Sequence, residues 1–344
     1  MTGPAEGPPE RRGPVRLRRS GDPERRGPAV VALGGGHGLA ASLSALARVT
    51  ERLTAVVTVA DDGGSSGRLR EEFGSLPPGD LRMALAALAG DRESEQRWES
   101  LLQHRFPGSG PLGGHAVGNL VLAGLTAVLG DPVPALDLVA QAVGARGRVL
   151  PASKVPLDIE AEVIGLDPSD PGAPVSVRGQ VAVATTPGHV RSVRLLPESP
   201  PATPEAVAAL DEADWVVLGP GSWFSSVLPH LLVPGLVEAL LRGRARTAVT
   251  LNLAPQPGET DGFSPEAHLE VLAAHAPGLR LDVVLADSAA VGDPRGLETV
   301  AGALGARVVL AEVATADGRP THDPGRLAAV YGQVMGCGLL AGRG

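Results

Sequence analysis

The sequence predicts an α/β protein in which a doubly wound, mostly parallel sheet is covered by helices on both faces. Short apolar runs alternate with Ala- and Leu-rich stretches of helical periodicity along most of the chain, which is typical of parallel sheets. Nearly every apolar run is followed at once by a loop rich in Gly, Asp, Asn or Ser. Since ligands bind beyond the carboxyl ends of parallel strands, at the topological switch point, we expect these loops to form a single site.

The composition fits a protein with a substantial core and argues against several functional classes. The 344 residues, 43% of them hydrophobic and 2% aromatic, suffice for about two domains or one large one, with a core of Ala, Val and Leu. A net charge of −8 argues against general nucleic-acid binding. The single cysteine, Cys337, provides neither an internal disulfide nor a Cys-based zinc site.

The N-terminal segment differs from the rest of the chain. Residues 1–28 are rich in Arg, Pro and Gly and poor in bulky apolar side chains, so they cannot bury enough surface to offset their ordering entropy. We expect a disordered tail over 1–28 and a single α/β domain over 29–344. No apolar stretch follows the basic N-terminus, and no apolar run reaches about 18 residues, so we expect neither a secretory signal nor a membrane span.

The first half of the chain reads as strands and helices in alternation. Apolar and β-branched runs predict strands at 29–33 and 53–59, and helical periodicity predicts helices through residue 46 and at about 80–89, 93–104 and 115–129. Pro77, Pro78 and Gly79 precede Asp80 at the start of one of these helices. We expect Asp80 to serve as its N-cap rather than as a ligand.

The middle of the chain breaks this pattern before the alternation resumes at Pro204. Short runs divided by Pro and Gly predict a β-rich insertion over about 147–196, with strands at 149–150, 159–164, 175–177, 181–183 and 193–196. Beyond the insertion, apolar runs predict strands at 215–218, 248–251, 283–285 and 308–310, separated by helices. The overall expectation is a doubly wound sheet with a helical and β-rich insertion.

The first Gly-rich loop favours phosphate binding. Gly34, Gly35, Gly36, His37 and Gly38 lie between a predicted strand and a predicted helix, where backbone amides and the helix dipole attract anions. The loop matches a dinucleotide fingerprint only loosely, and it is no P-loop because no Lys follows. The structural alternative is a tight turn without a ligand.

The most specific motif follows the second strand. Asp61 and Asp62 precede five small residues suited to binding an anion, Gly63, Gly64, Ser65, Ser66 and Gly67. Adjacent residues at a strand end point to opposite sides, so only one carboxylate faces the cleft easily. That carboxylate suits Mg²⁺ bridged to a diphosphate, or a ribose hydroxyl. The alternative is a solvated acidic turn.

A polar pair opens the apolar helix predicted at 115–129. His115 and Asn119 are four residues apart and therefore share one helix face. The pair either faces the ligand or has a capping or core role, and the residues alone leave both possibilities open.

Three further loops follow strands in the second half. Gly219, Gly221 and Ser222 form a second plausible anion-binding turn, with a purely structural turn as the alternative. Asn252 ends the next strand, and Asp261 follows in a polar segment where the fold places a cleft wall. No Gly-x-Ser-x-Gly nucleophile elbow is present at the second turn.

Together these loops resemble one family, the YvcK-type gluconeogenesis factors. The resemblance covers roughly 29–335 and rests on these motifs: Gly34–Leu39, Thr58–Arg70, Pro77–Asp80, Gly114–Leu120, Leu218–Ser222 and Gly258–Asp261. It implies a Rossmann-like fold related to CofD, the 2-phospho-L-lactate transferase of deazaflavin cofactor synthesis. It also implies a cytoplasmic location, binding of UDP-sugars, and a role in cell shape (morphogenesis) and wall synthesis during gluconeogenic growth.

The chain departs from the family pattern beside both phosphate turns. His37 stands where the family usually has Thr, and Trp223-Phe224-Ser225 stands where Tyr-Thr-Ser is usual. Trp223 either contacts a ligand held by the second turn or packs into the core.

Two principal functions follow. The first is a nucleotide-sugar-binding factor in which 34–38 and 65–67 hold the diphosphate, Asp62 or Asp61 holds Mg²⁺, and Asn252 and Asp261 contact the nucleoside or sugar. The second is a Mg²⁺-dependent, CofD-like transferase. A dinucleotide-dependent oxidoreductase rests only on the loose Gly match and is the weakest. No acid/base pair or nucleophile stands out, which favours binding, although metal and positioning alone can support phosphoryl chemistry. The sequence is compatible with a homo-oligomer.

Overall fold

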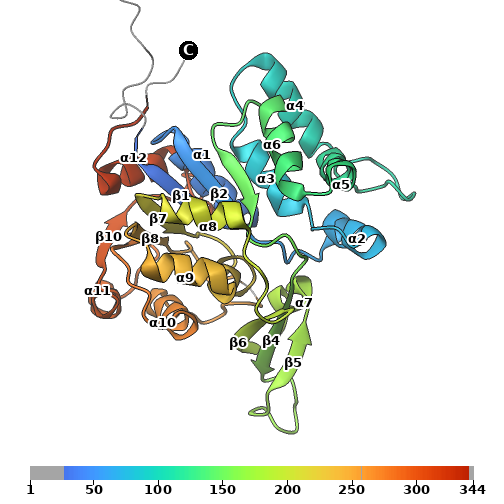
Figure 1. The fold of residues 1–344 in the computed structure, drawn as a ribbon. Coiled ribbons are helices and arrows are strands. Elements are labelled where there is room, and N and C mark those ends of the chain that lie inside the picture. The colour runs from blue at the N-terminus through green and yellow to red at the C-terminus, as the bar shows by residue number, and fades with distance from the viewer. Residues whose placement is uncertain (1–26, 257, 341–344) are drawn as a thin grey trace, which may run out of the picture.

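A computed structural model describes residues 27–340 apart from residue 257. Residues 1–26, which make up almost all of the predicted tail, lie outside this range. The described chain contains a large parallel sheet, a smaller antiparallel sheet and a group of helices beside them (Figure 1).

The large sheet confirms the predicted fold class. Its seven strands are all parallel and lie in the order β10-β9-β8-β7-β1-β2-β3. The strands are β1 (Ala29–Gly34), β2 (Arg52–Val57), β3 (Arg148–Pro151), β7 (Trp215–Leu218), β8 (Arg246–Thr250), β9 (Val283–Asp287) and β10 (Arg307–Ala311). The chain leaves β1 in one direction to form β2 and later leaves β7 in the opposite direction, so the topological switch point lies between β1 and β7.

Right-handed crossovers in opposite directions place helices on opposite faces of the sheet. Figure 1 shows α1, α3 and α12 on one face and α8 and α9 on the other. The helices of these layers are α1 (Gly36–Leu46), α3 (Gly79–Ala87), α8 (Pro204–Asp211), α9 (Pro234–Arg242), α10 (Pro265–His275), α11 (Pro294–Ala303) and α12 (Pro324–Met335). A π-helical turn, η2 (Trp223–Val227), and a 3-10 helix, η3 (Leu228–Leu232), follow β7.

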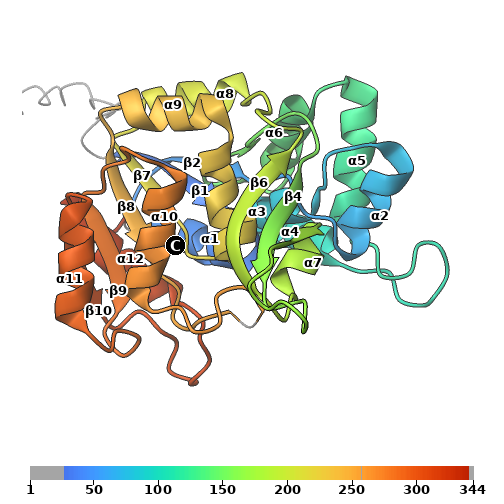
Figure 2. The same ribbon diagram turned by 90° about the horizontal axis from the view of Figure 1, so that it is seen from below.

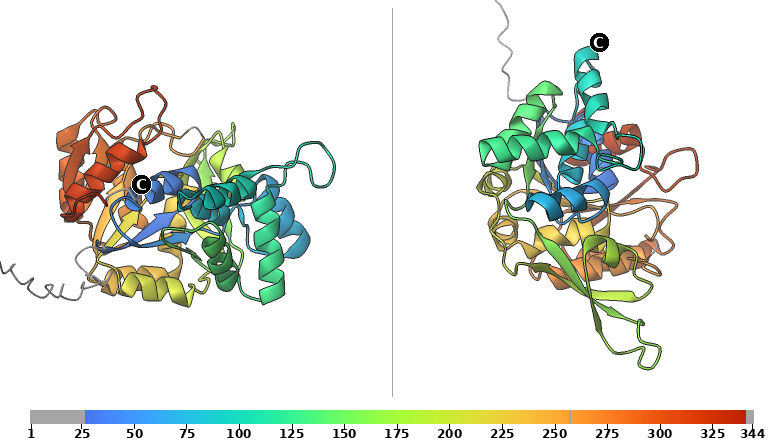
Figure 3. Two further views of the ribbon diagram at one scale, coloured as in Figure 1. Left: turned by 90° about the horizontal axis from the view of Figure 1, so that it is seen from above. Right: turned by 90° about the vertical axis from the view of Figure 1, so that its right-hand side faces the viewer.

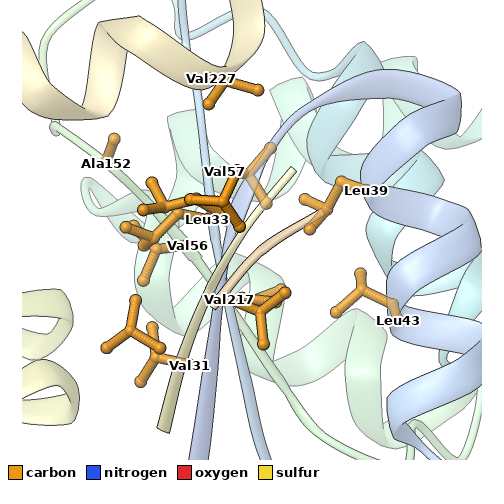
Figure 4. Packing of buried hydrophobic residues seen from close by; sticks show 14 of the residues in the cluster. Val31, Leu33, Leu39, Leu43, Val56, Val57, Ala152, Val217 and Val227 are labelled. Carbon is orange, nitrogen blue, oxygen red and sulfur yellow. The ribbon is translucent and has the colours of Figure 1, made fainter. Parts of the chain in front are cut away.

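The core is built from aliphatic side chains, as the scarcity of aromatic residues predicts. Val31, Leu33, Val56 and Val217 interdigitate on the central strands (Figure 4) and are 0–2% exposed. Tyr331 of α12 is a large polar side chain that is buried beside α1 and β8. Its hydroxyl has partners in Ser42 Oγ at 3.0 Å and Thr250 Oγ1 at 2.9 Å, which offsets the cost of burial.

The remaining helices form a group beside the β1–β3 end of the sheet. They are α2 (Gly64–Phe73), α4 (Glu93–Gln103), α5 (Val117–Leu129) and α6 (Pro132–Ala142). Figure 3 shows this group extending beyond the sheet.

The smaller sheet is the β-rich insertion, and it corrects two predictions. Its antiparallel order is β5 (Val175–Arg178), β4 (Asp158–Ile164) and β6 (His189–Leu196). The sheet projects from the rest of the fold in Figure 1, and Figure 2 shows β4 and β6 side by side. The run at 149–150 lies outside the insertion, because β3 pairs in parallel with β2. The strand predicted at 181–183 is wrong, since these residues form the short helix α7 (Gln180–Ala184).

Within 27–256 and 258–340, no single helix is long and apolar enough to cross a membrane. One pair bent by 74°, Trp223–Leu232 with Pro234–Arg242, meets the length and composition criteria. Residues 223–231 of this pair are buried inside the fold.

Candidate functional site

The loops after β1 and β7 lie directly against each other at the switch point. Gly34 ends β1, and Gly38 follows in the first turn of α1. A Cβ on Gly38 would lie 2.6 Å from Gly221 Cα and would overlap with the carbonyl of Pro220. Only glycine permits this approach, so the two Gly-rich turns predicted separately form one surface.

The N-terminus of α1 has no cap from its own residues, and the Gly36 amide donates to Asp80 of α3. Gly35 is the N-cap and provides no side-chain cap, and the first turn contains no acidic residue. His37 is exposed at the second helical position. First-turn amides have no partner within a helix, and the helix dipole adds partial positive charge.

The N-terminus of α2 repeats this arrangement after the neighbouring strand β2. Its N-cap, Gly63, has no side-chain cap, and Gly64 is exposed. Ser65 and Ser66 are buried, and Ser66 Oγ accepts a hydrogen bond of 3.0 Å from the Gly79 amide. Gly67 closes the first turn through its amide and the Gly63 carbonyl, 2.9 Å apart. Two helices without side-chain caps thus begin at adjacent strand ends.

The two adjacent carboxylates point in different directions, as their alternation predicts. Asp61 Oδ1 accepts from the Gly63 amide at 2.9 Å, and Asp61 Oδ2 would lie 2.7 Å from a Cβ on Gly79. Asp62 Oδ1 instead accepts from the Val181 amide at 3.0 Å. Asp62 therefore anchors α7 of the insertion, while Asp61 faces the start of α3.

Asp80 also lies at the start of α3. The prediction that Asp80 is the N-cap of this helix is wrong. Pro78 occupies the N-cap position, and Asp80 lies in the first turn at 9% exposure. Its Oδ2 atom is buried without a hydrogen-bond partner. Burial, followed by the charge of Asp61, raises the pKa of Asp80 to about 7, against a backbone hydrogen bond from Gly36 and the charge of Arg82. Asp80 is thus a buried carboxyl group between the starts of α1 and α3.

Behind these acids runs a buried chain of hydrogen bonds. Arg82 Nε donates to Asn119 Oδ1 at 2.9 Å, and Asn119 Nδ2 donates to Ser65 Oγ at 3.0 Å. Ser65 Oγ lies 2.9 Å from His115 Nδ1. Burial, and then the charge of Arg68, lower the pKa of His115, which favours the neutral imidazole. Asn119 and His115 thus meet at Ser65, and Asn119 supports the loop from inside the protein.

The turn at 219–222 is held by the protein's own side chains. Asn252 Oδ1 accepts from the Gly221 amide at 2.9 Å, and Asn252 Nδ2 donates to the Gly221 carbonyl at 2.8 Å. Both polar atoms of Asn252 therefore serve the turn. Asp261 is exposed, and its Oδ2 accepts from the Gly258 amide at 2.8 Å.

A carboxylate that sequence reasoning did not select fills the second anion turn. Glu259, 5% exposed, accepts from Ser222 Oγ at 2.5 and 2.7 Å and from the amides of Phe224 and Ser225 at 2.8 and 2.9 Å. Burial raises the pKa of Glu259, while these donors oppose the shift. In the sequence, only the position of Glu259 within the motif at 258–261 points to a role at the site.

Trp223 packs into the core and does not face the second turn's surface, which is one of the two predicted alternatives. Its side chain is 0% exposed and packs edge to face with His268, with ring centroids 5.1 Å apart. The departure from the family pattern at this position therefore lies inside the fold, whereas the departure at His37 lies on the surface.

Two hollows flank the Gly-rich loops. One of about 490 Å³ runs between α1, α3 and the end of α4, with His37, Arg82 and Arg105 among its lining residues. The other, of about 470 Å³, lies between α7 and the loops that contain Ser222 and Glu259. Among the described residues, no three His, Cys, Asp or Glu side chains group as a metal site.

Comparison with known proteins agrees with this architecture. The family model for "2-phospho-L-lactate transferase CofD" matches residues 30–302. The "Putative gluconeogenesis factor" of Mycobacterium tuberculosis (strain H37Rv) is 59% identical over 308 residues, covering 89% of this chain and 90% of the relative. The "Gluconeogenesis factor" of Bacillus subtilis is 38% identical over 264 residues, covering 77% and 80%.

Solved structures give the same result. The crystal structure of a UPF0052 family member from Bacillus halodurans superposes with a TM-score of 0.79 at 33% identity, covering 89% of this chain and 98% of that one. The chain therefore belongs to the CofD family, within its branch of YvcK-type gluconeogenesis factors.

Proposed function

We propose that this protein is a cytoplasmic nucleotide-sugar-binding factor that supports cell shape and wall synthesis during gluconeogenic growth. The observation that carries the proposal is the pair of helices, α1 and α2, that begin without side-chain caps at the ends of adjacent strands. Helix N-termini of this kind bind phosphates, and the switch point of a parallel sheet is where nucleotides bind.

The loops at this site have different roles in ligand binding. The diphosphate of a UDP-sugar lies against the first-turn amides of α1 and α2. The turn at 219–222 supports this surface from behind, since Glu259 and Asn252 already satisfy its polar groups. A nucleoside or sugar then extends into one of the two hollows beside the loops.

The residues present also fit a Mg²⁺ ion. Mg²⁺ is usually held by one or two carboxylates together with substrate phosphates and water, so a larger protein cluster is unnecessary. The charge of Asp61 is close enough to raise the pKa of Asp80, and Asp80 Oδ2 is buried without a partner. Mg²⁺ bound there would neutralise charge on a diphosphate.

The relatives' names support the physiological part of the proposal. Proteins described as gluconeogenesis factors match most of this chain. A binding factor that reports nucleotide-sugar supply needs only affinity and discrimination between ligands.

The decisive experiment changes one exposed residue of the first turn. His37→Asp places a carboxylate at the α1 N-terminus, where it stabilises the helix by about 0.3–1 kcal/mol but repels a diphosphate. Calorimetry with UDP-glucose, with and without Mg²⁺, should show binding to the parent and to the His37→Asn control. Binding to His37→Asp should fall at least tenfold without loss of melting temperature. Equal affinity of the three proteins would place the diphosphate elsewhere.

The match to the CofD family model favours one alternative, a Mg²⁺-dependent 2-phospho-L-lactate transferase-like enzyme. It predicts multiple turnovers when purified protein receives a deazaflavin precursor, an activated phospholactate donor and Mg²⁺. The binding proposal predicts no product above that of an Asp61→Asn Asp80→Asn double variant.

A further inference from the structure

The hollow between α1 and α3 has a charged end and a small-residue floor. Its walls include Ala40 and Ala41 of α1 and Ala86 and Ala87 of α3, and its volume is about 490 Å³. At the end nearest the α1 N-terminus the lining side chains are His37, Arg82 and Arg105. Of these side chains, Arg82 also belongs, through its Nε atom, to the hydrogen-bond chain that reaches Ser65 at the start of α2.

Arg82 is a buried side chain that is fixed from behind. It is 4% exposed, and its Nε atom is bound to Asn119 Oδ1 at 2.9 Å. Its stem passes so close to α5 that a Cβ on Gly118 would lie 2.9 Å from Arg82 Cδ and 3.0 Å from Cγ. The neighbouring residues Gly118 and Asn119 thus hold the guanidinium in one position.

The outer face of this guanidinium is free. Among the described residues, neither Nη atom of Arg82 has a hydrogen-bond partner, and Arg82 forms no ion pair. Arg105 lies next to it and uses Nη1 to donate to the Gly114 carbonyl at 2.9 Å. Burial, and then the charge of Arg105, lower the pKa of Arg82, against the charges of Asp80 and Asp61.

In the described part of the chain, the positive charge of the arginines that line the hollow is not balanced by ion pairs. Two guanidinium groups line it against one carboxylate, Glu99, which forms no ion pair with either of them among the described residues. Holding two like charges side by side in a partly buried position is unfavourable. An arginine with fixed geometry and unused Nη donors is the group that binds phosphate oxygens in a bidentate manner.

We propose that the Arg82–Arg105 hollow binds the phosphate group of a small phosphorylated molecule, whose uncharged part lies along the alanine floor. The phosphate contacts the Nη atoms of Arg82 and the guanidinium of Arg105. The unused Nη donors of Arg82 favour a phosphate here whether or not the α1 and α2 N-termini bind a nucleotide. The phosphate belongs either to the nucleotide ligand of the Gly-rich loops or to a second metabolite.

The test measures binding of inorganic pyrophosphate by calorimetry at constant ionic strength, because surface electrostatics depend on salt. Arg105→Gln removes an exposed positive charge of the hollow, and Arg82→Lys keeps the charge but loses the bidentate fork. Each should weaken binding about tenfold, the loss of one charge-assisted hydrogen bond. The matched control, Arg97→Gln, removes an exposed arginine of α4 that pairs with Glu93 outside the hollow, and it should bind like the parent.

A second titration identifies the source of the phosphate. If UDP-glucose displaces pyrophosphate and Arg105→Gln weakens both, the hollow is part of the nucleotide site. If both bind together and only pyrophosphate responds to Arg105→Gln, the hollow is a separate site, and this result stands even if UDP-glucose does not bind. Pyrophosphate affinity that is unchanged in Arg105→Gln, or absent in the folded parent, would overturn the proposal. Near-ultraviolet circular dichroism verifies that Arg82→Lys is folded.

Discussion

The buried carboxyl group of Asp80 carries a measurable cost in stability above neutral pH. Burial, with the Asp61 charge second, raises its pKa from 3.8 to about 7. A carboxyl group with a raised pKa binds its proton more tightly in the folded state. Its contribution to stability is therefore greatest at low pH and is lost as the pH rises from about 4 to about 7. A shift of about 3 units corresponds to roughly 4 kcal/mol at pH 8.

Asp80→Asn removes this titration while preserving the shape of the side chain. Relative to the parent, the variant should gain less than about 1 kcal/mol in free energy of unfolding at pH 4, about 2 at pH 5 and up to about 4 at pH 8. The new amide leaves one donor to satisfy, which costs about 1 kcal/mol at every pH. That cost lowers the whole curve without changing its rise.

The assay is urea unfolding of both proteins at half-unit steps from pH 4 to 8.5. Subtracting the two curves cancels all other titrating groups that the substitution leaves alone. A flat difference for Asp80→Asn would show that folding does not raise the pKa of Asp80. The same variant should lose Mg²⁺-dependent nucleotide binding, which would identify the stability cost as one retained for function.

Three other substitutions test the geometry of the loops. Asp61→Asn should abolish most of any Mg²⁺-dependent gain in nucleotide affinity, measured by calorimetry. Asp62→Asn should chiefly increase hydrogen exchange in α7, because Asp62 anchors that helix. The reverse pattern would place Asp62 in the cleft. Glu259→Gln replaces an acceptor with a donor facing donors, and it should lower the free energy of unfolding by about 1–3 kcal/mol in urea; no loss would show that the turn does not need the carboxylate. Gly38→Ala should destabilise the fold by about 3 kcal/mol or more through overlap with Pro220, and a parent-like melting temperature would contradict this packing.

The sequence predicted the parts of the fold that depend on local order along the chain. The strand at 215–218 and the helices at about 93–104 and 115–129 were predicted to within two residues, because apolar periodicity is a property of neighbouring residues. The failure at 181–183 comes from a contact that is distant in the sequence. The run at 181–183 has the composition of a strand, but Asp62 binds the Val181 amide from 119 positions away and stabilises a helix start.

The candidate site divides in the same way. Motif order alone determined that the Gly-rich and acidic loops share one edge of the sheet, since every loop that follows a parallel strand must emerge there. Only the tertiary structure decided what each side chain does. Asp61 and Asp62 are neighbours in sequence, yet one faces α3 and the other α7, because the direction of a side chain depends on which distant segment packs against it. For the same reason, the orphaned oxygen of Asp80 and the free guanidinium of Arg82 became visible only in the folded chain.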